Sequence, residues 1–148
     1  MIQRKQTLFL LGVVIIAIAQ FFITFQNIVI ANDYLPICLI PGCNSDIINT
    51  NIYFPIAFNI IILLLSVVII FLFKNRVLQY KLSNLLVVFN MFLLGLFFLL
   101  SFLKEGQTGT VSFQFGAFLP ILSAVFAYLA AHFIKKDEQL VRNADRIR

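Results

Sequence analysis

The sequence predicts an all-α polytopic membrane protein, a bundle of four transmembrane helices with its N and C termini in the cytoplasm. Hydrophobic residues make up 61% of the 148 residues and charged residues 11%, and the mean hydropathy is +1.01. A soluble domain is about half apolar and about a quarter charged. A soluble core of this size cannot bury so many apolar side chains, so we expect lipid to surround most of the chain.

The basic residues lie between the apolar runs in an alternating pattern. Ten of the eleven flank or separate the runs at every second boundary: Arg4, Lys5, Lys74, Arg76, Lys81, Lys135, Lys136, Arg142, Arg146 and Arg148. The two remaining gaps hold a single base, Lys104. Short basic loops stay on the cytoplasmic side of a membrane. The pattern therefore predicts four spans in one domain, residues 1–148, with both ends of the chain inside.

The first predicted span covers residues 7–25. Its basic start and the triplet Ala17-Ile18-Ala19 also match a signal peptide with a small-residue cleavage site. The apolar run continues past that triplet to Phe25 and reaches spanning length. We therefore expect an uncleaved first helix.

Residues 26–51 form the predicted external loop, which is unusually apolar and is expected to fold over the end of the bundle. It contains both cysteines, Cys38 and Cys43, with the turn signal Pro41-Gly42 between them. A disulfide is favoured in an oxidising compartment. Free thiols, and a redox pair that passes electrons to a quinone, remain open. Four-helix thiol oxidoreductases use Cys-x-x-Cys and further cysteines, whereas this chain has four residues between its cysteines and no second pair.

The second and third spans are predicted at residues 52–73 and 82–103, each near the roughly 20 residues that a helix needs to cross the hydrocarbon. Each contains one asparagine, Asn59 and Asn90. Such amides either form hydrogen bonds between helices or line a polar pocket for a lipid or a quinone. The four spans contain no Asp, Glu, Lys or Arg. This argues against proton relays and coupled transport, which depend on intramembrane charges.

The fourth span is predicted at residues 113–134, with a bend at a proline inside it. Small residues recur there at spacings of three and four and predict one helix-packing face: Gly116, Pro120, Ser123, Ala127 and Ala131. That face packs within the chain or against another protein. His132, the single histidine, lies near the cytoplasmic end of this span and is interpreted as an interfacial residue. No metal site is predicted, because His132 and the cysteines are expected on opposite sides of the membrane.

Residues 135–148 form a charged tail without Gly or Pro, predicted to continue the fourth helix into the cytoplasm. Either it is a solvated extension whose lysines contact lipid headgroups, or it docks a partner protein. The candidate docking residues are Glu138, Leu140, Val141, Arg142, Asp145, Arg146 and Arg148. The net charge of +5 is explained by the membrane boundary, so we expect the lipid bilayer as a partner and not nucleic acid; docking of another membrane or cytoplasmic protein through the tail stays open.

No catalytic constellation and no cofactor-binding motif emerges, and the oligomeric state stays open. The sequence favours a non-enzymatic accessory or scaffold subunit of a membrane assembly. The alternative is a lipid- or quinone-binding redox protein that uses the cysteine pair or the intramembrane amides.

Both ends of the chain resemble a known family. The opening Met1-Ile-Gln-Arg and the closing Lys135-Lys-Asp-Glu, Val141-Arg and Ala144-Asp-Arg-Ile-Arg are similar to those of an uncharacterised family of four-helix inner-membrane proteins of Bacteroidota. The resemblance implies a multi-pass protein of the bacterial inner membrane with both termini inside. It implies no activity, cofactor or catalytic residue, and the cysteine pair is not part of it.

Overall fold

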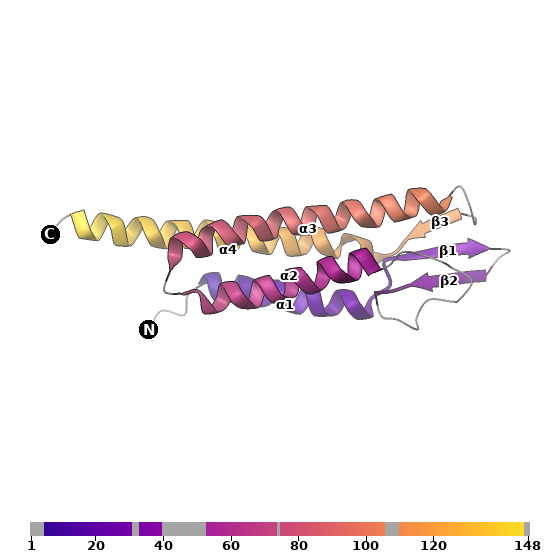
Figure 1. Ribbon diagram of the computed structural model, residues 1–148, viewed down its shortest axis with the longest axis horizontal. Helices are drawn as coiled ribbons and strands as arrows, with labels where there is room; N and C mark the ends of the chain where they lie inside the picture. The colour runs from indigo at the N-terminus through magenta and orange to yellow at the C-terminus, as the bar shows by residue number, and fades with distance from the viewer. Residues whose placement is uncertain (1–4, 31–32, 40–52, 74, 106–109, 147–148) are drawn as a thin grey trace.

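Four long helices lie side by side along one axis in the computed structural model, which describes residues 5–30, 33–39, 53–73, 75–105 and 110–146 (Figure 1). They are α1 (Lys5–Phe22), α2 (Tyr53–Phe71), α3 (Arg76–Glu105) and α4 (Leu119–Arg146). In the bundle, α1 packs against α2 and α4, and α3 packs against the same two helices. The predicted all-α membrane bundle is confirmed.

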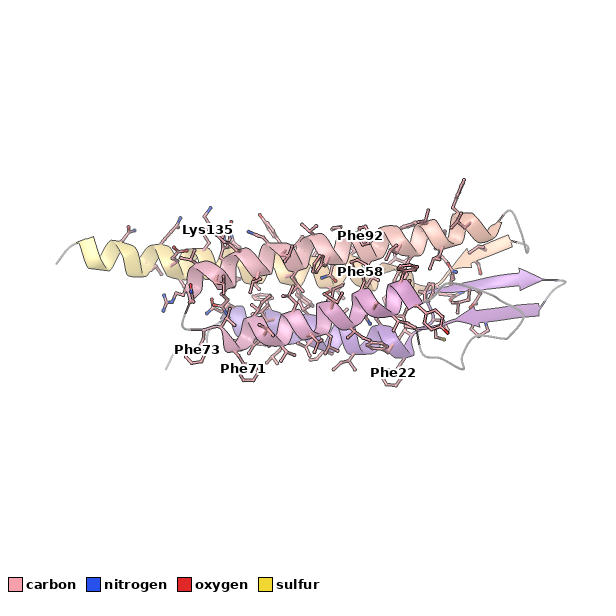
Figure 2. All side chains as sticks on the ribbon, in the orientation of Figure 1. Phe22, Phe58, Phe71, Phe73, Phe92 and Lys135 are labelled. Atoms are coloured by element: carbon pink, nitrogen blue, oxygen red, sulfur yellow. The ribbon has the colours of Figure 1, made fainter. Side chains whose placement is uncertain are left out.

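Apolar side chains cover the outside of this bundle, and several polar side chains lie inside it. Phe22 and Phe71 are 70% and 72% exposed, and both point away from the helices in Figure 2. Buried polar residues occur on every helix: Gln6, Gln20, Asn59, Ser66, Gln79, Ser83, Asn90, Ser101 and Ser123. Water would favour the opposite distribution, because burial of apolar surface is what stabilises a soluble fold. The surface is therefore suited to lipid.

Within the described residues, three helical segments are long and apolar enough to cross a membrane: Tyr53–Phe71, Arg76–Leu103 and Phe115–Leu140. The helix α1 is shorter, with an apolar segment of Gln6–Phe22. Its 18 residues correspond to about 27 Å, close to the roughly 30 Å of the hydrocarbon. It ends at Phe22, before the predicted limit at residue 25, because the chain turns there into a strand.

A small antiparallel sheet extends the bundle at one end, which we call the sheet end (Figure 1). Its strands are β1 (Gln26–Ile30), β2 (Asp33–Ile37) and β3 (Thr110–Phe113), in the order β2-β1-β3. In this way β1 pairs Gln26 with Ile37 on one side and with Phe113 on the other. The prediction for residues 26–51 is a folded loop, and this sheet is an addition to it.

The sheet is fixed to the last turns of α3, which continue beyond the start of α2 (Figure 1). Phe25, 2% exposed, stacks on Phe97 of α3 with ring centroids 4.5 Å apart. One turn further, the Ser101 hydroxyl donates a hydrogen bond of 2.5 Å to Oε1 of the buried Gln26. Thus α3 supports the sheet through a buried aromatic pair and a buried polar contact.

The fourth helix begins later than the predicted residue 113. Phe113 ends β3, a 3-10 turn η1 (Phe115–Phe118) follows, and α4 starts at Leu119. Pro120 therefore lies in the first turn of α4, where a backbone N–H would have no hydrogen-bond partner within the helix, so its absence costs little. Instead of bending a continuous span, it follows the 3-10 turn at which the helix starts.

At the opposite end, α4 continues past its neighbours (Figure 1). The guanidinium of Arg76, at the start of α3, donates a hydrogen bond of 3.2 Å to the Asp137 carbonyl. Residues 138–146 of α4 follow that contact, and in Figure 1 they extend alone beyond the other described helices. We call residues 138–146 the arm, and this end of the bundle the arm end.

Candidate functional site

Cys38 lies at the sheet end, directly after β2. It is 3% exposed and takes part in a disulfide. The chain's other cysteine, Cys43, lies outside the described residues, so the pairing of Cys38 with Cys43 stays a prediction. A buried sulfur in a disulfide holds the end of β2 in place, next to Ile37 and Leu39, which are also buried.

Two intramembrane amides, Asn59 and Asn90, lie at one level of the bundle. The ring of Phe58 contacts two rings of α3, those of Phe89 and Phe92, at centroid distances of 6.1 and 4.7 Å. Figure 2 shows Phe58 and Phe92 together. Because Asn59 follows Phe58 and Asn90 lies between the two α3 phenylalanines, these contacts fix both asparagines at the same depth. Both are fully buried.

A hydroxyl on α4, that of Ser123, belongs to the same level. The bond from Arg76 to Asp137 sets the register of α3 on the antiparallel α4. Asn90 is as many residues from Arg76 as Ser123 is from Asp137, and both helices rise about 1.5 Å per residue. Ser123 is also fully buried. We call Asn59, Asn90 and Ser123 the polar layer.

The polar layer joins α2 to α1 and leaves hydrogen-bond acceptors inside the bundle. Asn59 donates a bond of 3.0 Å to the carbonyl of Ala17 on α1. Asn90 donates one of 2.8 Å to the carbonyl of Leu86 in its own helix. With both amide N–H₂ groups engaged, Oδ1 of Asn59, Oδ1 of Asn90 and Oγ of Ser123 have no partner within the described residues. The layer thus offers acceptors to a donor such as water or a hydroxyl.

The predicted helix-packing residues are all buried, but they do not form one continuous helical face. Ser123, Ala127 and Ala131 lie on α4, which packs against both α1 and α3. Pro120 lies in the first turn of that helix. Gly116 belongs to η1, and its N–H donates a bond of 3.2 Å to the Thr24 carbonyl. It therefore packs closely against the chain segment between α1 and β1.

A cationic groove of about 400 Å³ lies near the arm end of α4. It is lined by His132, Lys135, Lys136 and Gln139, all exposed. These positions repeat at three, four and seven residues, so they share one stripe of the helix. The ammonium of Lys135 also lies 5.9 Å from the ring centroid of Tyr80 on α3. The prediction for His132 is a single interfacial residue, although its spacing in the sequence already groups it with the two lysines.

The predicted docking residues lie on the arm or beyond it. Leu140 is 61% exposed, and Glu138 is half-buried. The structure describes the helix but not the side chains at four further candidates, and the last candidate is outside the described residues: Val141, Arg142, Asp145, Arg146 and Arg148. Among the described side chains, no group of three His, Cys, Asp or Glu is placed to hold a metal ion.

The chain has been compared with known proteins. Neither the curated proteins nor the solved structures contain a match. A family model matches residues 2–147, which is nearly the whole chain and includes the helices, the sheet and the arm described above. The match confirms the resemblance to an uncharacterised family that both ends of the chain indicate. The chain therefore belongs to the family described as a domain of unknown function, DUF4293.

Proposed function

We propose that this membrane protein is a non-enzymatic accessory or scaffold subunit of an assembly in a bacterial inner membrane, and that the arm docks a cytoplasmic partner. The observation that carries the proposal is the continuation of α4 beyond Asp137, the residue at which its contact with Arg76 ends. This segment extends beyond the other described helices in Figure 1, so it contributes little to holding them together and is available to a partner.

The apolar and charged residues of the arm indicate which kind of protein surface would bind it. Leu140 is 61% exposed, and the sequence places Ala144 and Ile147 four and seven residues after it, the spacing of an apolar helical stripe. Three arginines and two carboxylates accompany this stripe within residues 138–148. An apolar groove bordered by carboxylates fits such a segment, since amphipathic helices bind by inserting their apolar face. We therefore propose a cytoplasmic protein with a groove of this kind as the partner.

The proposed orientation places the arm in the cytoplasm and the sheet end outside. It is supported by the alternating bases, since Arg76, Lys81, Lys135 and Lys136 all belong to the arm end. Reporter fusions after Asp33 and after Gln107 are expected to read as external, and one after Arg76 as cytoplasmic. The reverse pattern would place the arm outside the cell and remove its proposed partner.

Deletion of residues 138–148 tests the docking role. The deletion keeps Asp137, so the contact with Arg76 remains and the bundle is expected to keep its stability. Proteins that co-purify with the full chain from native membranes in mild detergent should be lost from the shortened chain. Leu140→Glu should reproduce the loss, whereas Asn143→Glu, which adds the same charge at another exposed position of the arm, should retain the partner. Identical co-purifying proteins in all four preparations would contradict the proposal.

A further inference from the structure

The cationic groove lies at the end of an exposed apolar track on the same face of α4. Going back from His132 along its stripe, the exposed residues are Tyr128, Val125 and Ile121, at 61%, 48% and 39%. The spacings of three and four residues keep all of them on one face. Along this stripe, the exposed side chains of α4 are mainly apolar as far as Tyr128. One turn later, from His132 onward, they carry N–H groups that donate hydrogen bonds.

The dimensions of this surface match one leaflet of a bilayer. From His132 to Ile121 the helix rises about 16 Å, and half of a hydrocarbon core is about 15 Å. The apolar track itself, from Tyr128 to Ile121, rises about 10.5 Å and fits within the acyl region of a single leaflet. The groove of about 400 Å³ begins where that region ends.

The charges in the groove favour an anion. Lys135 and Lys136 contribute two positive charges, and His132 and Gln139 supply further hydrogen-bond donors. The neighbouring carboxylates, Asp137 and Glu138, do not belong to the lining residues. Glu138 lies three residues after Lys135 and borders the groove from the side, so the lining itself remains cationic.

Packing against α3 restrains the groove before any ligand binds. The ring of Tyr80 lies 5.9 Å from the Lys135 ammonium, an attractive cation–π distance. The guanidinium of Arg76 holds the same turn of α4 through the Asp137 carbonyl. A lysine that is already oriented loses less freedom on binding, which strengthens the site.

We propose that this groove binds the headgroup phosphate of an anionic phospholipid from the leaflet at the arm end, with an acyl chain lying along Tyr128, Val125 and Ile121. The phosphate accepts hydrogen bonds from the two lysines, His132 and Gln139. A zwitterionic phospholipid is disfavoured, because its own cationic group would lie near Lys135 and Lys136. The inference concerns α4 within the bilayer and does not depend on a partner of the arm.

Lipid retention tests the site. The full chain is reconstituted into vesicles with equal amounts of phosphatidylglycerol and phosphatidylcholine and extracted in mild detergent, and the lipid that stays bound is measured by mass spectrometry. We expect one phosphatidylglycerol per chain. A lysine that contacts the headgroup phosphate is worth about fivefold in affinity for anionic lipid, so Lys136→Gln should lower the preference about fivefold and the double variant Lys135→Gln, Lys136→Gln about 25-fold.

Lys81→Gln is the matched control, because it removes one exposed lysine at the same end without touching the groove. It should change the preference less than twofold. Equal retention of both lipids by the unmodified chain, or an equal loss in Lys81→Gln, would overturn the proposal. So would displacement of the lipid by inorganic phosphate, which would identify a site for a free anion. Circular dichroism checks that each variant keeps its helices.

Discussion

Gly116 of η1 lies directly against the backbone of the segment after α1, and Gly116→Ala is expected to destabilise the protein strongly. An added Cβ would overlap the Thr24 carbonyl oxygen and lie 2.8 Å from its carbon and 3.1 Å from Cγ2 of Ile23. The obstructing atoms are mainly backbone, so no rotamer change relieves the overlap. Inserting a methyl group into a tightly packed site costs about 1–3 kcal/mol. The bond from Gly116 N–H to Thr24, 3.2 Å long, adds about 1 kcal/mol if the two segments separate.

The expected loss for Gly116→Ala is therefore about 2–4 kcal/mol of unfolding free energy. Two other glycines provide a graded control. A Cβ on Gly12 would lie 3.3 Å from the side-chain ring of Phe126, which can yield, so we expect a loss below about 1 kcal/mol. A Cβ on Gly95 would meet nothing within 4 Å, and alanine is the better helix former, so that variant should be neutral or slightly more stable.

Titration with sodium dodecyl sulfate in mixed micelles, followed by circular dichroism, measures these free energies. The reasoning would be refuted if Gly116→Ala unfolded within about 0.5 kcal/mol of the unmodified chain, or if Gly95→Ala lost as much as Gly116→Ala. Either result would mean that the tight contact with Thr24 is absent or relaxes without cost.

Three further predictions follow from the interior and the sheet end. Asn59→Ala should cost about 1–2 kcal/mol in the same titration, because it removes the bond to α1 and leaves the Ala17 carbonyl unpaired. Ser123→Ala should cost less than about 0.5 kcal/mol, since the hydroxyl has no partner within the described residues; a loss equal to that of Asn59→Ala would show that it is bonded. Reduction of the disulfide of Cys38 should lower the unfolding free energy by about 2 kcal/mol for the six-residue ring of the predicted Cys38–Cys43 pair, and unchanged stability in dithiothreitol would argue against a structural role.

The apolar runs locate the helices well, because each contains enough consecutive apolar residues to cross the hydrocarbon. The second run, residues 52–73, gives α2 at Tyr53–Phe71. The third, residues 82–103, underestimates α3, which starts at Arg76 and ends at Glu105. The first turns of α3 contain basic residues before Leu82, so they are not part of an uncharged apolar run. Lys and Arg are nevertheless good helix formers, and the helix includes them.

The sheet could not be located in the same way. Ile28-Val29-Ile30 is a β-branched run followed by the turn-favouring residues Asn32 and Asp33, of which Asp33 begins β2, and this signal alone would have suggested the β1–β2 hairpin. The pairing of β1 with β3 joins Val29 to Thr110, and no local pattern specifies so distant a partner. Nor does hydropathy separate the end of β3 from the start of α4, because apolar residues continue through both.

The candidate sites also differ in whether local sequence spacing or tertiary packing brings their residues together. The spacing of the residues in the cationic groove is local to α4 and can be recognised in the sequence. The polar layer combines Asn59, Asn90 and Ser123 from three helices, and its common level depends on the registers set by the Phe58 rings and by Arg76. Those registers arise from tertiary packing. The sequence of each span identifies its buried polar residue, but it does not predict that the three residues lie at the same level.

The central place of β1 in the sheet has a consequence for biosynthesis. β1 and β2 are made early, but the strand that covers the other edge of β1 is made roughly 80 residues later, after α2 and α3. At about 5–20 residues per second, that edge waits roughly 4–16 s for its partner. During this interval an open strand is available to other nascent chains. A ribosome that stalls before residue 110 therefore leaves behind a hairpin with an uncovered edge, which is a substrate for membrane quality control and not a smaller version of the finished protein.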